Sequence, residues 1–227
     1  MEHASNAAAA QCAALAARLS EQAALALQDL PQRVHPLWVE SLEVDPGVLA
    51  SGGPKLMNAV LQARFDLCWP DLSAANHALE LAWLLPPAQV RQLCAARALY
   101  GFRGILARTV DAATRRGARL LLGSDAFNAL VQLPERRREE RPLPALEPEG
   151  IVVAGWGLLG SQLAWRDVRL RRLVELALPP PASRARKALW RSREHAAEHA
   201  EFVAAVKYLF PEHQWLFGSE LASLKSA

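Results

Sequence analysis

The chain has 227 residues, of which 52% are hydrophobic and 22% are charged, and its formal net charge is +3. This length and apolar content are enough for one large domain, or two small lobes, with a real hydrophobic core. The same numbers argue against a disordered chain and against a dedicated nucleic-acid-binding protein, although the sequence pI of about 9.0 gives a mild basic bias.

The N-terminal part of the chain is predicted as helices separated by prolines. Residues 4–29 are rich in alanine, their apolar side chains recur at helical spacing, and Pro31 ends this helix. Residues 35–53 contain two prolines and a Gly-Gly pair, which predicts a loop-rich connector with one short helix over 38–42. Pro54 begins the next predicted helix.

The next predicted helix starts near Ser73, which is a suitable cap for it, and ends in the block over residues 79–85. Pro86 and Pro87 end this helix because proline cannot continue it, and the fixed φ of Pro87 suits the first turn of the next. That next helix runs to Tyr100.

Two further helix boundaries are predicted in the middle of the chain. A third helix passes through residues 105–110, and Gly123 supplies the left-handed C-cap of the helix after it. Ser124 and Asp125 can cap the start of the helix that follows.

The C-terminal half begins with a change of composition. Residues 134–150 combine mixed charge with repeated proline, which predicts an exposed linker. Apolar side chains over 159–177 then line one helical face, and the prolines at 179–181 stop that helix. A long helix over 183–209 and an aromatic tail over 210–217, which we expect to pack on the body, complete the chain.

We therefore predict an all-α fold, an irregular multi-helix domain with loop-rich connectors. It spans residues 1–227 as one domain, or as two lobes, 1–133 and 151–227, joined by the linker. No targeting segment is evident, and no apolar stretch approaches the roughly 20 residues that a membrane-spanning helix needs. We expect a cytoplasmic protein.

Several short segments resemble the SctK family of accessory proteins of type III secretion systems. They are Trp83-Leu84-Leu85-Pro86 before a Leu-rich helix, Tyr100-Gly101, an Arg-bearing helix, Leu122-Gly123, and more weakly His35-Pro36-Leu37-Trp38, Gly155-Trp156 and the tail from Phe210 to Gly218. The likeness covers most of the chain in patches, and none of the patches is a strict motif.

This resemblance implies a non-catalytic adaptor without a cofactor. Members of the family are linked to the sorting platform beneath the injectisome, on the cytoplasmic side of the inner membrane. The implied partners are the cytoplasmic forkhead-associated-like domain of the ring protein (SctD-type) and the C-ring-like platform protein (SctQ-type).

One alternative is a small NAD(P)-binding oxidoreductase. Gly155, Gly157 and Gly160 form a G-x-G-x-x-G pattern after an apolar run, and Glu175 stands about where a ribose-binding acid could lie. However, Glu175 would fall within the presumed second strand, no third strand remains, and Trp156 would put a bulky side chain in the phosphate turn. A Gly-rich start of a helix, with Trp156 in the core, is the favoured interpretation.

A second alternative is a zinc hydrolase. His195, Glu198 and His199 match an H-x-x-E-H pattern, and both imidazoles would lie on one helix face. The third ligand would have to be found among Glu201, Glu212, His213 and Glu220. Phe202 and Val206 continue the stripe of His199, so a partly buried interface face explains the pattern more simply.

The remaining candidates carry weaker signals. Arg115, Arg116 and Arg119 form a cationic cluster that is by default a solvated helix face, although it could meet an acidic partner or a phosphate. The seven tryptophans suggest core anchors, of which any exposed subset would be candidate hot spots for protein contacts. Reduced core thiols are the favoured interpretation of the three widely spaced cysteines, Cys12, Cys68 and Cys94.

Overall fold

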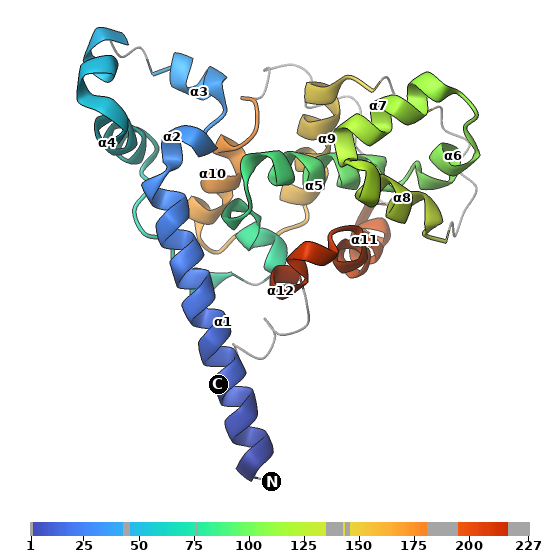
Figure 1. The fold of residues 1–227 in the computed structure, drawn as a ribbon, viewed down its shortest axis with the longest axis horizontal. Helices are drawn as coiled ribbons and strands as arrows, with labels where there is room; N and C mark the ends of the chain where they lie inside the picture. Colours follow the sequence, from blue (N-terminus) through green and yellow to red (C-terminus); the bar gives the residue numbers. More distant parts are fainter. Residues whose placement is uncertain are drawn as a thin grey trace. The chain divides into compact units, whose positions relative to one another are not determined.

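The computed structural model describes residues 2–42, 46–75, 77–134, 143, 146–180 and 195–217. Every regular element in these residues is a helix, and no described residue lies in a strand, which confirms the all-α prediction (Figure 1). The α-helices are α1 (Glu2–Gln28), α2 (Leu30–Arg33), α3 (Pro36–Glu40), α4 (Pro46–Phe65), α5 (Pro87–Tyr100), α6 (Arg103–Arg108), α7 (Ala112–Leu122), α8 (Ser124–Gln132), α9 (Pro148–Gly160), α10 (Val168–Leu176), α11 (His195–Leu209) and α12 (Gln214–Phe217). The 3₁₀-helices are η1 (Leu72–Ala74), η2 (Ala78–Leu84) and η3 (Pro211–His213).

The chain forms two compact units that alternate along the sequence. Unit 1 takes its described residues from Met1–Pro87, Ala164–Pro180 and Gln214–Ala227, and unit 2 from Ala88–Leu163 and Pro181–His213. Each unit therefore includes residues from both sides of the predicted linker at 134–150. Most of that linker lies outside the described residues, and α9 begins within it, at Pro148. The domain organisation predicted from the sequence stays a prediction.

The first helices end where the sequence indicates. Asp29 leaves the helical conformation between α1 and α2, and Pro31 lies in the first turn of α2. Within α4, Gly53 has non-helical dihedral angles (φ 64°, ψ −169°), so a new helical segment does begin at Pro54. Residues 46–52 are also helical, where the sequence predicted loop.

The 3₁₀-helix η2 lies at the centre of unit 1, where it contacts α1, α10 and α12. Its residues from Leu79 to Leu84 are all buried. The sequence predicted an ordinary helix here, but both ends favour a short, tight segment. The Nδ1 atom of His77 accepts a hydrogen bond from the Leu79 N–H (3.1 Å), and Leu85 is extended because Pro86 follows it.

Two predicted caps are wrong and one is confirmed in part. Asp71, not Ser73, caps the first turn in this region, since its carboxylate accepts from the Ser73 N–H at 2.9 Å. Ser124 is the first residue of α8 rather than its cap, and the N-cap position is Gly123. Gly123 does adopt a positive φ (80°), and its N–H donates to the Arg119 carbonyl to close α7. Its ψ of 157° places it outside the left-handed helical region that was predicted.

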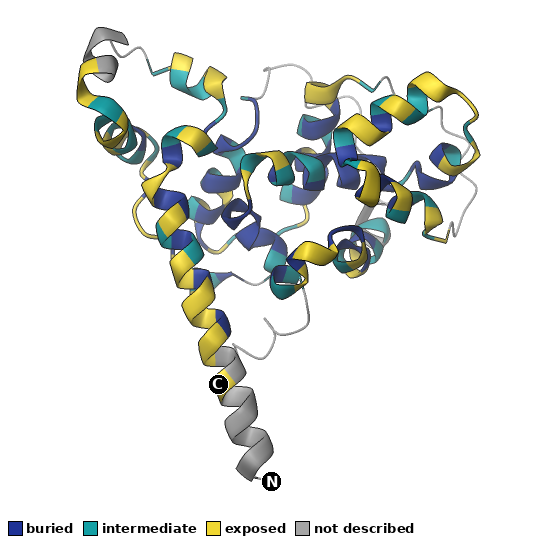
Figure 2. Ribbon diagram, in the orientation of Figure 1, coloured by how far each residue is buried: buried dark blue, intermediate teal, exposed yellow. Residues whose placement is uncertain are grey.

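Helices α5 to α9 and α11 form unit 2. In α5 every residue from Leu93 to Tyr100 is buried. Helix α8 contacts α6, α7 and α11, and α11 also contacts α9. Buried and exposed residues alternate along α7 in the manner of an amphipathic helix, with Ala118 and Leu122 on its buried side (Figure 2).

The continuous helical face predicted over 159–177 is wrong. Helix α9 ends at Gly160, and α10 begins only at Val168. The carboxylate of Asp167 causes the restart, because it accepts a hydrogen bond from the Arg169 N–H (2.9 Å) and so caps α10. In this non-helical stretch the chain passes from unit 2 to unit 1.

The C-terminal prediction is confirmed where the structure describes it. Helix α11 covers the described part, 195–209, of the helix predicted over 183–209. The tail packs on the body, since Phe210 and Leu216 are buried and α12 contacts η2. The guanidinium of Arg18 lies 4.2 Å from the centre of the Trp215 ring.

Candidate interaction surfaces

A buried ion pair connects α5 with α11 in unit 2. The Arg97 side chain is 0% exposed, and its Nη1 atom donates to the Oε1 atom of Glu198 at 2.5 Å. A second arginine, Arg103, donates to the carbonyl oxygens of Tyr100 and Pro134 and lies 3.6 Å from the Glu201 carboxylate. Glu198 and Glu201 of α11 therefore face Arg97 of α5 and Arg103 of α6.

This arrangement bears on the predicted zinc site. Glu198, the glutamate of the H-x-x-E-H pattern, is held by the guanidinium of Arg97. The side chain of His195 lies outside the described residues, and His199 is half-buried on α11. Within the described part of the chain, no group of three or more His, Cys, Asp or Glu side chains is placed to hold a metal ion. The described residues therefore give the zinc alternative no third ligand, and Glu220 and the side chain of His195 lie outside them.

The three glycines of the dinucleotide pattern lie inside α9, so the alternative that depends on them is wrong. Residues 151–154, which would have to form the first strand, belong to the same helix. Gly155 serves packing instead: a Cβ atom there would collide with the backbone carbonyl of Cys94 on α5. Gly157 faces open space. Trp156 is buried, as the favoured interpretation predicted, but the glycines lie in the C-terminal half of α9 and not at the start of a helix.

The cysteines differ in their surroundings. Cys94 is buried, and burial raises the pKa of its thiol to about 12, which makes it an inert core residue. Cys68 is exposed, so the prediction of a core thiol is wrong there. The side chain of Cys12 lies outside the described residues.

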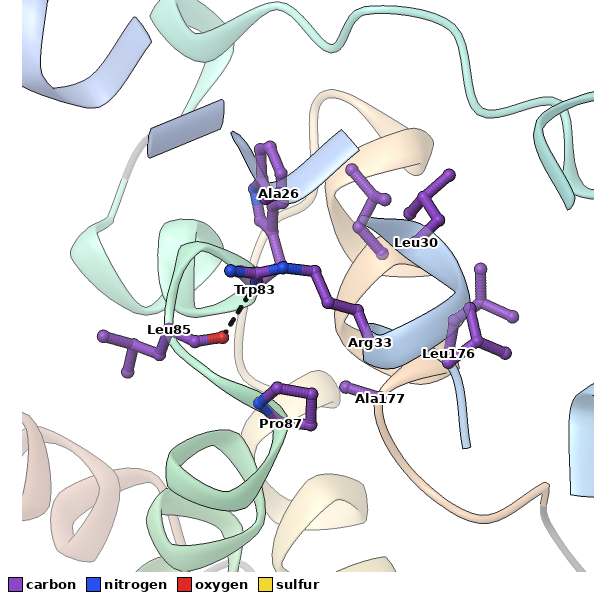
Figure 3. A pocket seen from close by; sticks show the side chains of 10 residues that line it. Ala26, Leu30, Arg33, Trp83, Leu85, Pro87, Leu176 and Ala177 are labelled. Atoms are coloured by element: carbon purple, nitrogen blue, oxygen red, sulfur yellow. Dashed lines mark hydrogen bonds between the residues drawn. The ribbon is translucent and has the colours of Figure 1, made fainter. Parts of the chain in front are cut away.

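Arg33 is one of the residues that line a small cavity in unit 1 (Figure 3). The volume of the cavity is about 10 Å³, enough for one water molecule at most and far too small for a cofactor. Arg33 donates to the carbonyl oxygens of Trp83 (2.9 Å) and Leu85 (3.1 Å), which lie at the C-terminal end of η2. Burial lowers the pKa of Arg33 from its ordinary value, and its role is structural.

In unit 2, one face of α7 presents arginine and leucine to solvent. We call this set of exposed residues the α7 face: Ala112, Ala113, Arg116, Arg119 and Leu120. Leu120 is 80% exposed, and Val110, just before the helix, is 96% exposed. Arg119 also lies over the ring of Phe127, at 5.1 Å from its centre.

In unit 1, two exposed apolar side chains lie on distant segments that hydrogen bonds join. We call Trp69 (51% exposed) and Val168 (61% exposed) the Trp69 patch. Arg169 joins the segments, because its Nη1 atom donates to the Trp69 carbonyl (3.1 Å) while its guanidinium binds the carboxylate of Asp167. The Asp71 N–H donates to the same carboxylate at 2.9 Å. These hydrogen bonds hold together the two segments that carry the patch, and one of its side chains is a large aromatic.

A comparison with known protein families shows the family to which this chain belongs. Residues 7–212 match the family model described as bacterial type III secretion protein (HrpB4). The chain belongs to the HrpB4 family of type III secretion proteins. No curated protein and no solved structure gives a significant match. The family match confirms the recognition of a type III secretion protein, which the sequence allowed through its likeness to SctK.

Sequence reasoning found part of this HrpB4-family chain's surface chemistry and missed the rest. The cationic cluster was identified, and Arg116 and Arg119 do lie on an exposed helix face. The buried ion pair was missed, although a single arginine within the apolar run of α5 was a usable signal. The Trp69 patch had no sequence signal, because it needs residues about 100 positions apart.

No described helix is long and apolar enough to span a membrane.

Proposed function

We propose that this chain is a non-catalytic cytoplasmic adaptor that joins the inner-membrane ring of a type III secretion system to its sorting platform. The observation that carries the proposal is membership in a type III secretion family over residues 7–212. The expected partners are the forkhead-associated-like cytoplasmic domain of the ring protein and the C-ring-like platform protein, as the resemblance to SctK implies.

The described surfaces support an adaptor role. An adaptor needs two separate contact areas, and exposed large apolar side chains are typical of protein contacts. Here Trp69 and Val168 are exposed in unit 1, and Leu120 and Val110 are exposed in unit 2. Neither set is needed to form the core of its own unit.

A three-component pull-down tests the proposal. The ring-protein domain is immobilised, and the platform protein is added with or without this chain. We expect the platform protein to be retained only when the chain is present. Equal retention without the chain, or a chain that binds neither protein, would contradict the adaptor function.

Metal analysis tests the remaining catalytic alternative. The chain is purified without a metal-affinity tag, and its zinc content is compared with that of a variant carrying His195→Ala and His199→Ala. Stoichiometric zinc that is lost in the variant would overturn the non-enzymatic proposal. We expect no such difference, because Glu198 is already held by Arg97.

A further inference from the structure

We propose that the α7 face is a docking surface for an acidic segment of a partner protein, one that also places an apolar side chain against Leu120. The inference deepens the proposed function, on which it rests, by assigning one of the two contact areas and the chemistry of its partner.

The exposed residues of α7 follow a regular pattern along the helix. Ala112, Arg116 and Leu120 follow one another at intervals of four, so their side chains form one stripe along the helix. The small side chain of Ala112 leaves room at one end, and Leu120 stands 80% exposed at the other. A helix that only faced solvent would place polar side chains at both positions. The stripe therefore combines a cationic centre with an apolar end, as protein contact sites often do.

Arg116 and Arg119 make the α7 face positively charged. Within the described residues, neither Arg116 nor Arg119 makes an ion pair. The nearby carboxylate of Asp111 is occupied as the helix cap, since it accepts from the N–H groups of Ala113 and Thr114. The face thus carries two positive charges that no described carboxylate pairs with. Complementary charge on a partner would orient it and speed its association.

The core of unit 2 does not depend on the α7 face. The opposite side of α7 is filled by Ala118 and Leu122 and packs on α8. Leu146 lies against Gly117 on the flank, where a Cβ atom would come within 3.3 Å of its side chain. The arginines and Leu120 can therefore be engaged by a partner without disturbing the core of unit 2.

The observations favour a protein partner over a membrane or a nucleic acid. Binding in a membrane interface needs a broad apolar face, and the apolar side of α7 is already buried in unit 2. A nucleic-acid surface needs a larger basic area than this chain, with its net charge of +3, provides. Arginine, by contrast, is enriched among the residues that dominate protein interfaces.

The test measures the affinity of the intact chain for the ring-protein domain and for the platform protein separately, at low and high salt. The variant carries Arg116→Glu and Arg119→Glu. The matched control carries Lys55→Glu and Arg64→Glu, which makes the same change of net charge at exposed cations of α4 in unit 1. Circular dichroism verifies that both remain folded. A third variant, Leu120→Ser, tests the apolar contact without changing charge.

We expect the variant to lose at least about tenfold in affinity for one partner, because it sets like charges opposite each other. The control should bind as the wild type does, Leu120→Ser should weaken the same partner, and high salt should weaken the wild-type complex. A variant that binds both partners normally overturns this inference and leaves the proposed function standing. A wild type that binds neither partner overturns both.

A second arm separates a lipid surface from a protein partner. Vesicles of phosphatidylglycerol and phosphatidylethanolamine are incubated with the wild type and the variant. We expect no difference between them. Vesicle binding that the variant loses, with both protein affinities unchanged, would overturn the inference in favour of a membrane-binding surface.

Discussion

Arg97 and Glu198 lie 101 positions apart in the chain, and the Nη1 atom of the first is 2.5 Å from the Oε1 atom of the second. One turn beyond Glu198, the ring of Phe202 meets the ring of Tyr100 edge to face, with centres 5.4 Å apart. Together these contacts fix the position of α11 against α5 within unit 2. The glutamate of the apparent zinc motif therefore has a structural role.

Removing Glu198 should destabilise the protein strongly. Glu198→Ala leaves the guanidinium of Arg97 fully buried without its carboxylate, and breaking such a pair costs about 3 kcal/mol. Replacing both residues by methionine should recover much of the loss, because no buried charge then remains. Free energies of unfolding from urea titrations measure both effects.

Glu175→Ala is the matched control for this prediction. Its partner Arg171 is 46% exposed and lies one turn away on α10, so the loss should be below about 0.5 kcal/mol. Equal costs at Glu198 and Glu175 would show that burial does not strengthen the first pair.

Two glycines of α9 should respond in opposite directions to alanine. Gly155→Ala drives a methyl group into the Cys94 backbone, and such overpacking costs roughly 1 to 3 kcal/mol. Gly157→Ala meets nothing within 4 Å and should stabilise the helix by roughly 0.5 to 1 kcal/mol. Thermal unfolding of the two variants measures the difference. A neutral Gly155→Ala would mean that α9 does not pack on α5 this closely.

The sequence predicted the helical class and most helix ends, since these depend on local periodicity and on residues such as Pro31 and Gly123. It was wrong over 159–177, where apolar side chains from two separate helices happened to continue one spacing. The break depends on the cap formed by Asp167, which periodicity does not detect. Local patterns also predicted that Ser73 caps the helix that ends at residue 85, whereas Asp71 caps the turn over 72–74 and His77 caps η2.

The surface features were less predictable than the helices. The arginines of α7 could be located because they lie within one helix. The Trp69 patch and the pair of Arg97 with Glu198 each join segments about 100 residues apart, so a single sequence does not show which residues meet. The arginine within the apolar run of α5 signals a buried charge but not its partner. The glycine motif misled for the same reason: Gly155 is explained by the Cys94 backbone, which is distant in the chain.

The Asp167 carboxylate should contribute to the free energy of unfolding at neutral pH and lose this contribution in acid. Hydrogen bonds from Arg169 hold the pKa of this carboxyl below its ordinary value. The stabilisation is therefore fully present above about pH 4, near the pKa of an unfolded aspartate, and is lost as the pH falls through the lower folded value. Asp167→Asn keeps an oxygen for the cap but removes the charge. We expect it to cost roughly 1.5 to 3 kcal/mol at neutral pH and less in acid.

The measurement is the free energy of unfolding of wild type and Asp167→Asn across the acid range. The difference between the two proteins should shrink as the pH falls below about 4. A difference that stays constant would show that the charge of Asp167 contributes nothing and that only the cap matters.

The tail should be essential for a folded chain. Truncation after Leu209 removes Phe210 and Leu216, which are buried, together with Trp215 and Phe217. Full burial of such side chains is worth roughly 1.5 to 3 kcal/mol each, and a typical domain is stable by about 5 to 15 kcal/mol. We expect the truncated chain to be poorly soluble and to fail in the three-component pull-down. Leu216→Ala, at a cost of about 2 to 5 kcal/mol, should remain soluble enough to confirm the packing by unfolding measurements.

Neutralising the predicted linker is the contrasting case. Arg136, Arg137 and Arg138 lie outside the described residues, and exposed charges in a linker contribute little to stability. Their replacement by glutamine should leave unfolding and the pull-down as in the wild type.

A truncated chain that stays folded but loses one partner would mark the tail as a binding surface, because its absence would then remove a contact rather than the fold. A truncated chain that stays folded and keeps both partners would contradict the packing argument, since the buried side chains of the tail would then contribute too little to matter.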